Sequence, residues 1–189
     1  MKKNLKISYN APVVLTFVLL GFLVTLAGVL SGSRMTTMLF SVYRSSMTNP
    51  MTYVRLFTHV LGHSGFEHFI GNAMYLLLLG PILEEKYSSA TMLKVILATA
   101  LVTGIIHCAL WGNVILCGAS GVVFAYIVLS SFTAFKEGEI PLTFLLVAAL
   151  FIGQEVYTGL FVADNVANLT HIIGGVVGAA AGYILNKRR

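Results

Sequence analysis

Two polar residues of this chain lie inside strongly apolar stretches. Ser120 stands in Gly118-Ala119-Ser120-Gly121, directly before the apolar run 122–129, and His171 stands in a second apolar run, 168–178. A histidine at membrane depth is unfavourable unless it has a function there. A serine hydroxyl becomes a nucleophile when a neighbouring base removes its proton. We therefore interpret Ser120 and His171 as a candidate nucleophile and general base for peptide hydrolysis inside a membrane.

Both residues also have a structural interpretation. A short stretch of small residues around Ser120 is a common packing site in membrane helices, and His171 could simply form an interhelical hydrogen bond. However, glycines follow His171 at four-residue spacing and leave a smooth groove on one helix face. A helix that presents Ser120 and Gly121 fits such a groove. The glycines are Gly174, Gly178 and Gly182.

A third group of polar residues precedes these two. His68 and Asn72 are four residues apart, so they share one face at the start of an expected helix. Acyl transfer needs hydrogen-bond donors aimed at the oxyanion, and His68, Asn72 and the Ser120 amide form a candidate set. A zinc site is the alternative, although no H-E-x-x-H motif accompanies these residues. We expect His59 and His63 to hold the neighbouring segment by structural hydrogen bonds.

An acidic third member of a triad is not evident. Glu155 and Asp164 are candidates, and Glu155 either lines a functional cavity or contacts water. A serine and a histidine without an acid are chemically sufficient if packing holds the imidazole. Cys108 and Cys117 flank a short connection, so they form either a disulfide or two unreacted thiols.

The composition is that of an integral membrane protein. The chain is 57% hydrophobic and 10% charged, with a mean hydropathy of +0.87, whereas soluble domains have about 25% charged residues. The net charge of +5 and the pI of about 9.3 are explained by cationic loops at a membrane, so nucleic acid is not an expected partner.

We predict an all-α bundle that forms one membrane domain over residues 1–189. A more polar stretch, 32–66, is expected as a loop on the outer side. Each expected helix is close to the length that about 30 Å of hydrocarbon requires. The six expected membrane helices are 11–31, 67–83, 91–110, 119–135, 141–159 and 168–186.

The distribution of basic residues predicts the orientation. If both termini lie inside the cell, the inner segments hold nine basic residues and the outer segments three, which agrees with the positive-inside rule. Ser120 and His171 then both lie near the outer ends of their helices. The inner residues are Lys2, Lys3, Lys6, Lys86, Lys94, Lys136, Lys187, Arg188 and Arg189, and the outer ones are Arg34, Arg44 and Arg55.

These motifs, taken together and in this order, resemble the rhomboid family of intramembrane serine proteases. The resemblance covers roughly Arg55 to Gly182, and includes the histidines before the second expected helix. The family patterns are G-x-S-G in the fourth helix, H-x-x-x-N in the second, and His followed by G-x-x-x-G in the sixth. Here they are Gly118-Ala119-Ser120-Gly121, His68 to Asn72, and His171 with Gly174 and Gly178.

The resemblance implies specific roles. Ser120 is then the nucleophile, His171 the general base, and the oxyanion hole is formed by His68, Asn72 and the Ser120 amide. It also implies a membrane enzyme that needs no metal or other cofactor. Its substrates are single-span membrane proteins, cleaved near the outer boundary of the bilayer.

Three positions depart from the common family pattern. Phe124 stands where many bacterial relatives carry a tyrosine beneath the catalytic histidine. Arg55 follows Val54 in place of the usual tryptophan, and Thr170 replaces an alanine. None of these changes removes a reacting group.

Two functions of other classes are the alternatives. A non-catalytic rhomboid-like protein would bind membrane helices without cleaving them, and intact Ser120 and His171 disfavour it. A small transporter or channel would show internal repeats or a chain of charges through several helices. Neither feature is present in this sequence.

Overall fold

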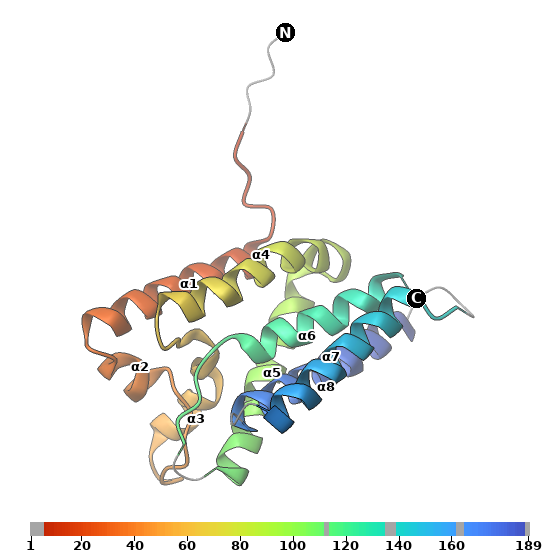
Figure 1. Ribbon diagram of the computed structural model, residues 1–189. Helices are drawn as coiled ribbons and strands as arrows, with labels where there is room; N and C mark the ends of the chain where they lie inside the picture. Colours follow the sequence, from red (N-terminus) through yellow and green to blue (C-terminus); the bar gives the residue numbers. More distant parts are fainter. Residues whose placement is uncertain (1–5, 112–113, 135–138, 162–164, 188–189) are drawn as a thin grey trace.

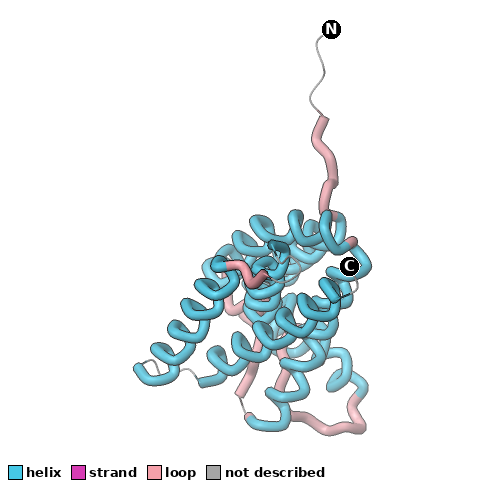
Figure 2. Tube along the Cα trace, turned by 90° about the vertical axis from the view of Figure 1, so that its right-hand side faces the viewer, coloured by secondary structure: helices cyan, strands magenta, loops and turns pink. Residues whose placement is uncertain are grey.

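Apolar runs of about twenty residues form the long helices of this protein. The computed structural model describes residues 6–111, 114–134, 139–161 and 165–187, and most of that part is helical (Figure 1). Figure 2 shows the helices crossing one another while the stretch before the first helix extends away. The long helices are α1 (Pro12–Leu30), α4 (Phe66–Tyr87), α5 (Ser89–Leu110), α7 (Leu142–Phe161) and α8 (Asn165–Lys187).

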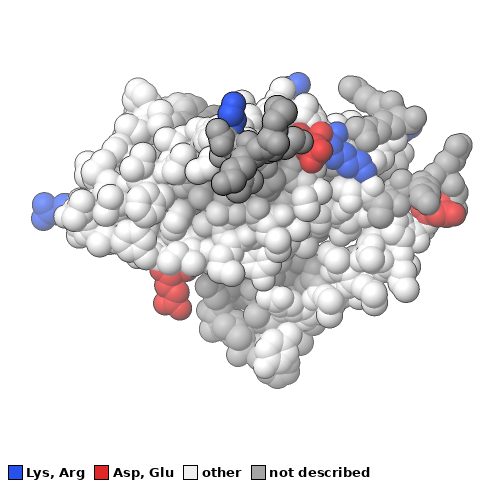
Figure 3. All heavy atoms as spheres, turned by 90° about the horizontal axis from the view of Figure 1, so that it is seen from above, with Lys and Arg blue, Asp and Glu red and all other residues white. Residues whose placement is uncertain are grey.

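The surface of the bundle is largely uncharged. Viewed from the end at which the chain begins, scattered Lys, Arg, Asp and Glu side chains are separated by wide uncharged areas (Figure 3). Large apolar side chains are exposed along the long helices, as expected for contact with lipid. Examples on α1 and α4 are Leu23, Leu30, Leu78 and Ile82.

Four helices in the described part of the chain are long and apolar enough to cross a membrane. They are Pro12–Leu30, Phe66–Tyr87, Ser89–Leu110 and Asn168–Lys187. The expected fourth helix, 119–135, is divided: α6 spans Ser120–Ser131 and continues as one 3-10 turn, η2 (Phe132–Ala134), and residue 135 lies outside the described residues. At 1.5 Å per residue the 12 residues of α6 cover about 18 Å, and the 3-10 turn adds about 6 Å, so the two together remain below the hydrocarbon thickness of about 30 Å.

The segment 32–66 contains short helices in place of the expected continuous loop. They are α2 (Arg34–Leu39), α3 (Pro50–Thr58) and the 3-10 turn η1 (His59–Leu61). The start of α3 has a local cause: the Asn49 side chain accepts a hydrogen bond from Met51 N at 2.9 Å, and Pro50 fits the first helical position.

The second long helix, α4, ends later than expected, at Tyr87 instead of residue 83. This extension places Glu84 inside the protein, where it is 4% exposed. Its carboxylate accepts hydrogen bonds from the backbone N–H groups of Val13 and Val14, at 2.9 and 3.0 Å, and from the Ser89 hydroxyl at 2.6 Å. First-turn N–H groups have no partner within their own helix, so Glu84 caps α1 from a different helix.

The short helix α6 lies at the centre and packs against α4, α5, α7 and α8. Val122, Ala125, Tyr126 and Leu129 are completely buried. Because α6 is enclosed by other helices, its length does not have to match the bilayer.

Two glycines of α8 bring its backbone against that of α6. A β-carbon added to Gly174 would lie 3.0 Å from the Cα of Gly121 and still closer to its carbonyl oxygen. The same addition at Gly178 would lie 2.8 Å from the Cα of Ala125. The expected packing of the glycine groove against the serine-bearing helix is therefore present.

This contact predicts a steric effect that is specific to position. Gly178→Ala should lower the free energy of unfolding by about 1–3 kcal/mol, because the new methyl group meets backbone that cannot move aside. Gly153→Ala in α7 is the matched control, since nothing lies within 4 Å of an added β-carbon there. Thermal unfolding in detergent measures both, and equal midpoints for the two variants would contradict the tight contact.

Candidate functional site

A cavity of about 880 Å³ collects the polar residues that the sequence singles out. Ser120, His171, His68 and Asn72 all line it. They come from three helices, α6, α8 and α4, that are far apart along the chain. The other residues that line the cavity are Ser64, Glu67, Gly71, Tyr75, Val114, Ile115, Leu116, Cys117, Val123, Phe124, Ile127 and Gln154.

Ser120 is the first residue of α6. The backbone N–H groups of a first helical turn have no partner within the helix, and the positive end of the helix dipole lies there. The Ser120 amide is therefore a donor in a region that favours negative charge.

The chain reaches Ser120 through Gly118, which has a φ of +136°. Side chains other than glycine are strained in that region. A β-carbon at Gly118 would also lie 2.9 Å from Nε2 of His68. Glycine is required both by the turn and by the close approach of the imidazole.

His171 is held by an aromatic ring on the serine-bearing helix. Phe124 stacks on its imidazole with ring centroids 4.2 Å apart and an interplanar angle of 29°. Phe124 is one turn after Ser120, so both lie on one face of α6. The ring that stands in place of tyrosine thus still orients the histidine by stacking.

The two residues on α4 present polar groups to the same cavity. His68 Nδ1 is 3.2 Å from the Ser64 hydroxyl oxygen, and when Ser64 donates this bond the neutral ring carries its proton on Nε2. Asn72 is 8% exposed, and its Nδ2 has no hydrogen-bond partner among the described residues. A buried amide donor without a partner is unfavourable unless a ligand or water uses it.

His63 supports the segment that leads to the serine. Its Nδ1–H donates to the Leu61 carbonyl at 3.1 Å, and its Nε2 accepts from the Ala119 N–H at 3.4 Å. Its ring meets that of His68 edge-on, with centroids 5.0 Å apart. These bonds require a neutral ring, and burial lowers the pKa of His63 to about 4, assisted by the nearby His68.

His59 has a comparable supporting position. Its Nδ1–H donates to the Arg55 carbonyl at 3.1 Å, and its Nε2 is 3.2 Å from the Thr103 hydroxyl. Its own carbonyl accepts from the Gly118 N–H at 3.0 Å. Burial lowers the pKa of His59 to about 4, so this ring too is neutral at pH 7.

Arg55 is 4% exposed and connects parts of the segment 32–66. Its guanidinium lies 4.2 Å from the centre of the Tyr43 ring, and donates to the Tyr43 hydroxyl at 2.5 Å and the Ser45 hydroxyl at 2.8 Å. The aromatic partner that is missing at Val54 is therefore supplied by Tyr43. Cation–π contacts of this kind are strongest when the charge is shielded from water.

The structure also bears on the hypotheses about the cysteine pair, a metal site and the candidate acids. Cys108 and Cys117 are free thiols, so the disulfide alternative is wrong. Within the described ranges, no group of three or more His, Cys, Asp or Glu side chains is arranged to hold a metal ion. Asp164 and the side chain of Glu155 lie outside the described part of the chain.

Two buried polar residues have roles that no motif in the sequence indicates. Glu84 directly follows the expected helix 67–83, and it caps α1. His107 is 2% exposed near the end of α5 and donates from Nε2 to the Val114 carbonyl at 2.8 Å. Its signal in the sequence was the same as that of His171, a histidine within an apolar run.

Comparison with known proteins gives two kinds of match. The family model described as Rhomboid domain matches residues 50–188. Rhomboid-related protein 1 of Caenorhabditis elegans is 27% identical over 140 residues, which cover 69% of this chain and 39% of the relative. Rhomboid-related protein 2 of Mus musculus is 28% identical over 158 residues, which cover 72% and 52% respectively. The chain thus spans about half or less of the length of these relatives.

The two supporting histidines predict acid sensitivity. Their pKa values in the folded protein, about 4, lie below the ordinary 6.5, so the unfolded chain binds protons more readily. The contribution of these neutral rings to the free energy of unfolding is fully present above pH 6.5. It is lost as the pH falls toward 4, at up to about 1.4 kcal/mol per pH unit for each ring. Thermal midpoints measured from pH 7 to 4 should fall steeply. His63→Gln should reduce the slope, and an unchanged slope would contradict this origin.

Proposed function

This chain belongs to the rhomboid family, and from that premise we propose that it is an intramembrane serine endopeptidase. Ser120 is the nucleophile and His171 the general base. The substrates are single-span membrane proteins, hydrolysed in or near their transmembrane segments. The observation that carries the proposal is the cavity that Ser120, His171, His68 and Asn72 share.

The reaction follows from the chemistry of these groups. His171 removes the proton of the Ser120 hydroxyl while Oγ attacks the scissile carbonyl, and an acyl-enzyme forms when the protonated imidazole returns that proton to the leaving amine. Water then attacks the acyl-enzyme while His171 removes one of its protons. The imidazole passes that proton to Ser120 Oγ as the acyl group leaves, which restores the free enzyme. In both steps the negative oxygen meets the Ser120 amide, the unpartnered Asn72 Nδ2 and the Nε2 of His68.

In the proposed mechanism the imidazole of His171 must be held in a fixed orientation. In a triad the acid fixes the ring and its tautomer. Here stacking on Phe124 fixes the plane of the His171 ring. Proton transfer needs only a neutral ring at the right position, so this arrangement supports catalysis by two residues.

The membrane arrangement of the proposed enzyme follows from helix lengths and charge. We place six helices, α1 and α4–α8, across the cell membrane, with both termini cytoplasmic and the cavity facing outward. Because α6 is short, its first residue, Ser120, lies below the membrane surface and needs a water-filled cavity. A substrate helix must unwind locally to bring its carbonyl there.

The proposal predicts that each member of the dyad is essential. Ser120→Ala and His171→Ala should each abolish cleavage of a single-span substrate in proteoliposomes, and each should abolish labelling by a fluorophosphonate. The physical reason is that neither an unactivated serine nor an unassisted base forms the acyl-enzyme at a measurable rate.

The same assay includes a test of folding and of the rival function. Both variants should retain the thermal midpoint of the wild-type protein, so that lost cleavage reports chemistry. Retained cleavage in either variant would refute the dyad. A folded wild-type protein that binds membrane segments without cleavage or labelling would favour the non-catalytic binder.

The oxyanion assignment predicts a graded loss. Asn72→Ala should lower kcat about a hundredfold with a smaller change in KM, because its amide acts on charge that develops in the transition state. Asn186→Ala is the matched control: its Nδ2 donates to Tyr87 Oη at 3.3 Å, in a different part of the bundle. Equal kcat and KM values for the two variants would contradict the assignment of Asn72 to the oxyanion hole.

A further inference from the structure

His107 is a buried histidine that the proposed reaction does not use. It lies in the last turn of α5, and it does not line the catalytic cavity. Its Nε2 is 2.8 Å from the Val114 carbonyl oxygen. A carbonyl only accepts, so Nε2 carries the proton. The other nitrogen, Nδ1, is buried and has no partner among the described residues.

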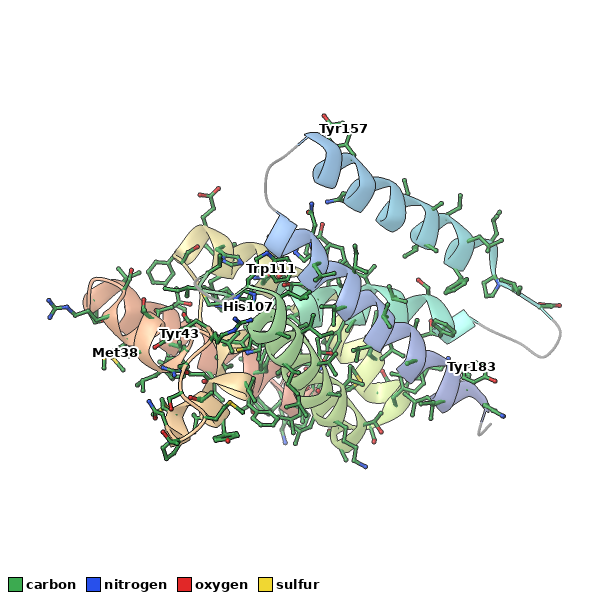
Figure 4. The ribbon with its side chains drawn as sticks, turned by 90° about the horizontal axis from the view of Figure 1, so that it is seen from below. Met38, Tyr43, His107, Trp111, Tyr157 and Tyr183 are labelled. Carbon is green, nitrogen blue, oxygen red and sulfur yellow. The ribbon has the colours of Figure 1, made fainter. Side chains whose placement is uncertain are left out.

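The imidazole has a second contact, with Trp111. The two rings stack with centroids 5.8 Å apart and an interplanar angle of 22°. Figure 4 shows the two labelled side chains lying next to each other. The ring is therefore held by stacking, while its single hydrogen bond is directed at the backbone of Val114.

Val114 begins the stretch 114–117, which lines the cavity just before the catalytic serine and is named here the wall. Leu116 is attached through two backbone hydrogen bonds with Val42, at 2.8 and 3.0 Å. Among the described residues, no backbone hydrogen bond of this kind attaches Val114 or Ile115, whose side chains are 42% and 51% exposed. In the described part of the chain, the bond from His107 is therefore the contact that attaches the start of the wall.

We propose that His107 is a positioning residue for substrate binding, which holds the wall in place through the Val114 carbonyl. The proposal rests on the protease function, because the wall contacts a substrate that reaches Ser120. His107 touches neither reacting residue. Its loss should weaken substrate binding while the chemistry at Ser120 continues.

Two substitutions separate the hydrogen bond from the stacking. In His107→Gln the amide nitrogen reaches the position of Nε2 and keeps the donor, but the ring is lost. In His107→Phe the ring remains to stack on Trp111, but the donor is lost. A purely structural role of the aromatic ring predicts that Phe is tolerated and Gln is not, which is the opposite of our expectation.

The kinetic expectation is a change in KM. His107→Phe removes the donor that holds the Val114 carbonyl and so releases the start of the wall. It should raise KM about tenfold, with kcat within about twofold of wild type. His107→Gln should remain within about twofold in both constants. Fluorophosphonate labelling of Ser120 should be the same in all three proteins, because the small probe does not need the wall.

A second readout does not depend on catalysis. Cys117 lies in the wall, so its rate of reaction with a maleimide in a Cys108→Ser background reports the position of the wall. The rate should change several-fold in His107→Phe and stay unchanged in His107→Gln. If the wild-type protein neither cleaves nor is labelled by the fluorophosphonate, the protease function fails while this readout still tests His107.

Three results would overturn the proposal. One is identical KM values and identical Cys117 reactivity for the Phe and Gln variants. Another is a loss of fluorophosphonate labelling in His107→Phe, which would place its effect on the catalytic centre. The third concerns Trp111→Leu, which keeps the hydrogen bond of His107 and removes the stacking. If Trp111→Leu raises KM and His107→Phe does not, stacking is the relevant contact. This variant also provides the test if His107→Phe does not fold.

Discussion

The backbone contact between α6 and α8 is the constraint on which the site depends. Gly174 and Gly178 have no side chains to separate the two helices, so the backbones of Gly121 and Ala125 lie directly against them. Phe124 can then stack on His171, which places the histidine on the serine-bearing face of α6. Any side chain in this contact would move the imidazole relative to Ser120. The same close approach leaves α6 enclosed, which allows it to be shorter than a membrane span.

The polar residues of the cavity could be predicted from the sequence, because local spacing places each of them on a definite helix face and the order of the motifs resembles one family. His68 and Asn72 share a face because they are four residues apart, and Ser120 begins a helix because small residues precede an apolar run. The glycine spacing after His171 identified the face that packs. The positions of the long helices followed from hydropathy, because a bilayer selects for length and apolar content. The lengths of the enclosed helices were less predictable. Neighbouring helices surround α6, so it does not have to match the bilayer, and hydropathy does not detect such neighbours.

Other features depend on partners that are distant in sequence. The partner of Arg55 is Tyr43, which no motif marks, and the short helices α2 and α3 occupy a stretch whose mixed composition resembles a loop. Three histidines, His59, His63 and His107, hold the approach to the serine through backbone groups. Backbone acceptors and donors leave no trace in residue type, so such bonds are found only in three dimensions.

The Glu84 cap has a consequence for where the functional unit begins. The family match starts at residue 50, yet Glu84, inside the matched region, holds the first turn of α1, which precedes it. Removal of α1 would take away two of the three hydrogen bonds that the Glu84 carboxylate accepts and would uncover the side of α4 against which α1 packs. We therefore expect the boundary of cooperative unfolding to lie before the boundary that sequence similarity defines. On this expectation the first helix belongs to the same thermodynamic unit as the cavity, although the family match does not include it.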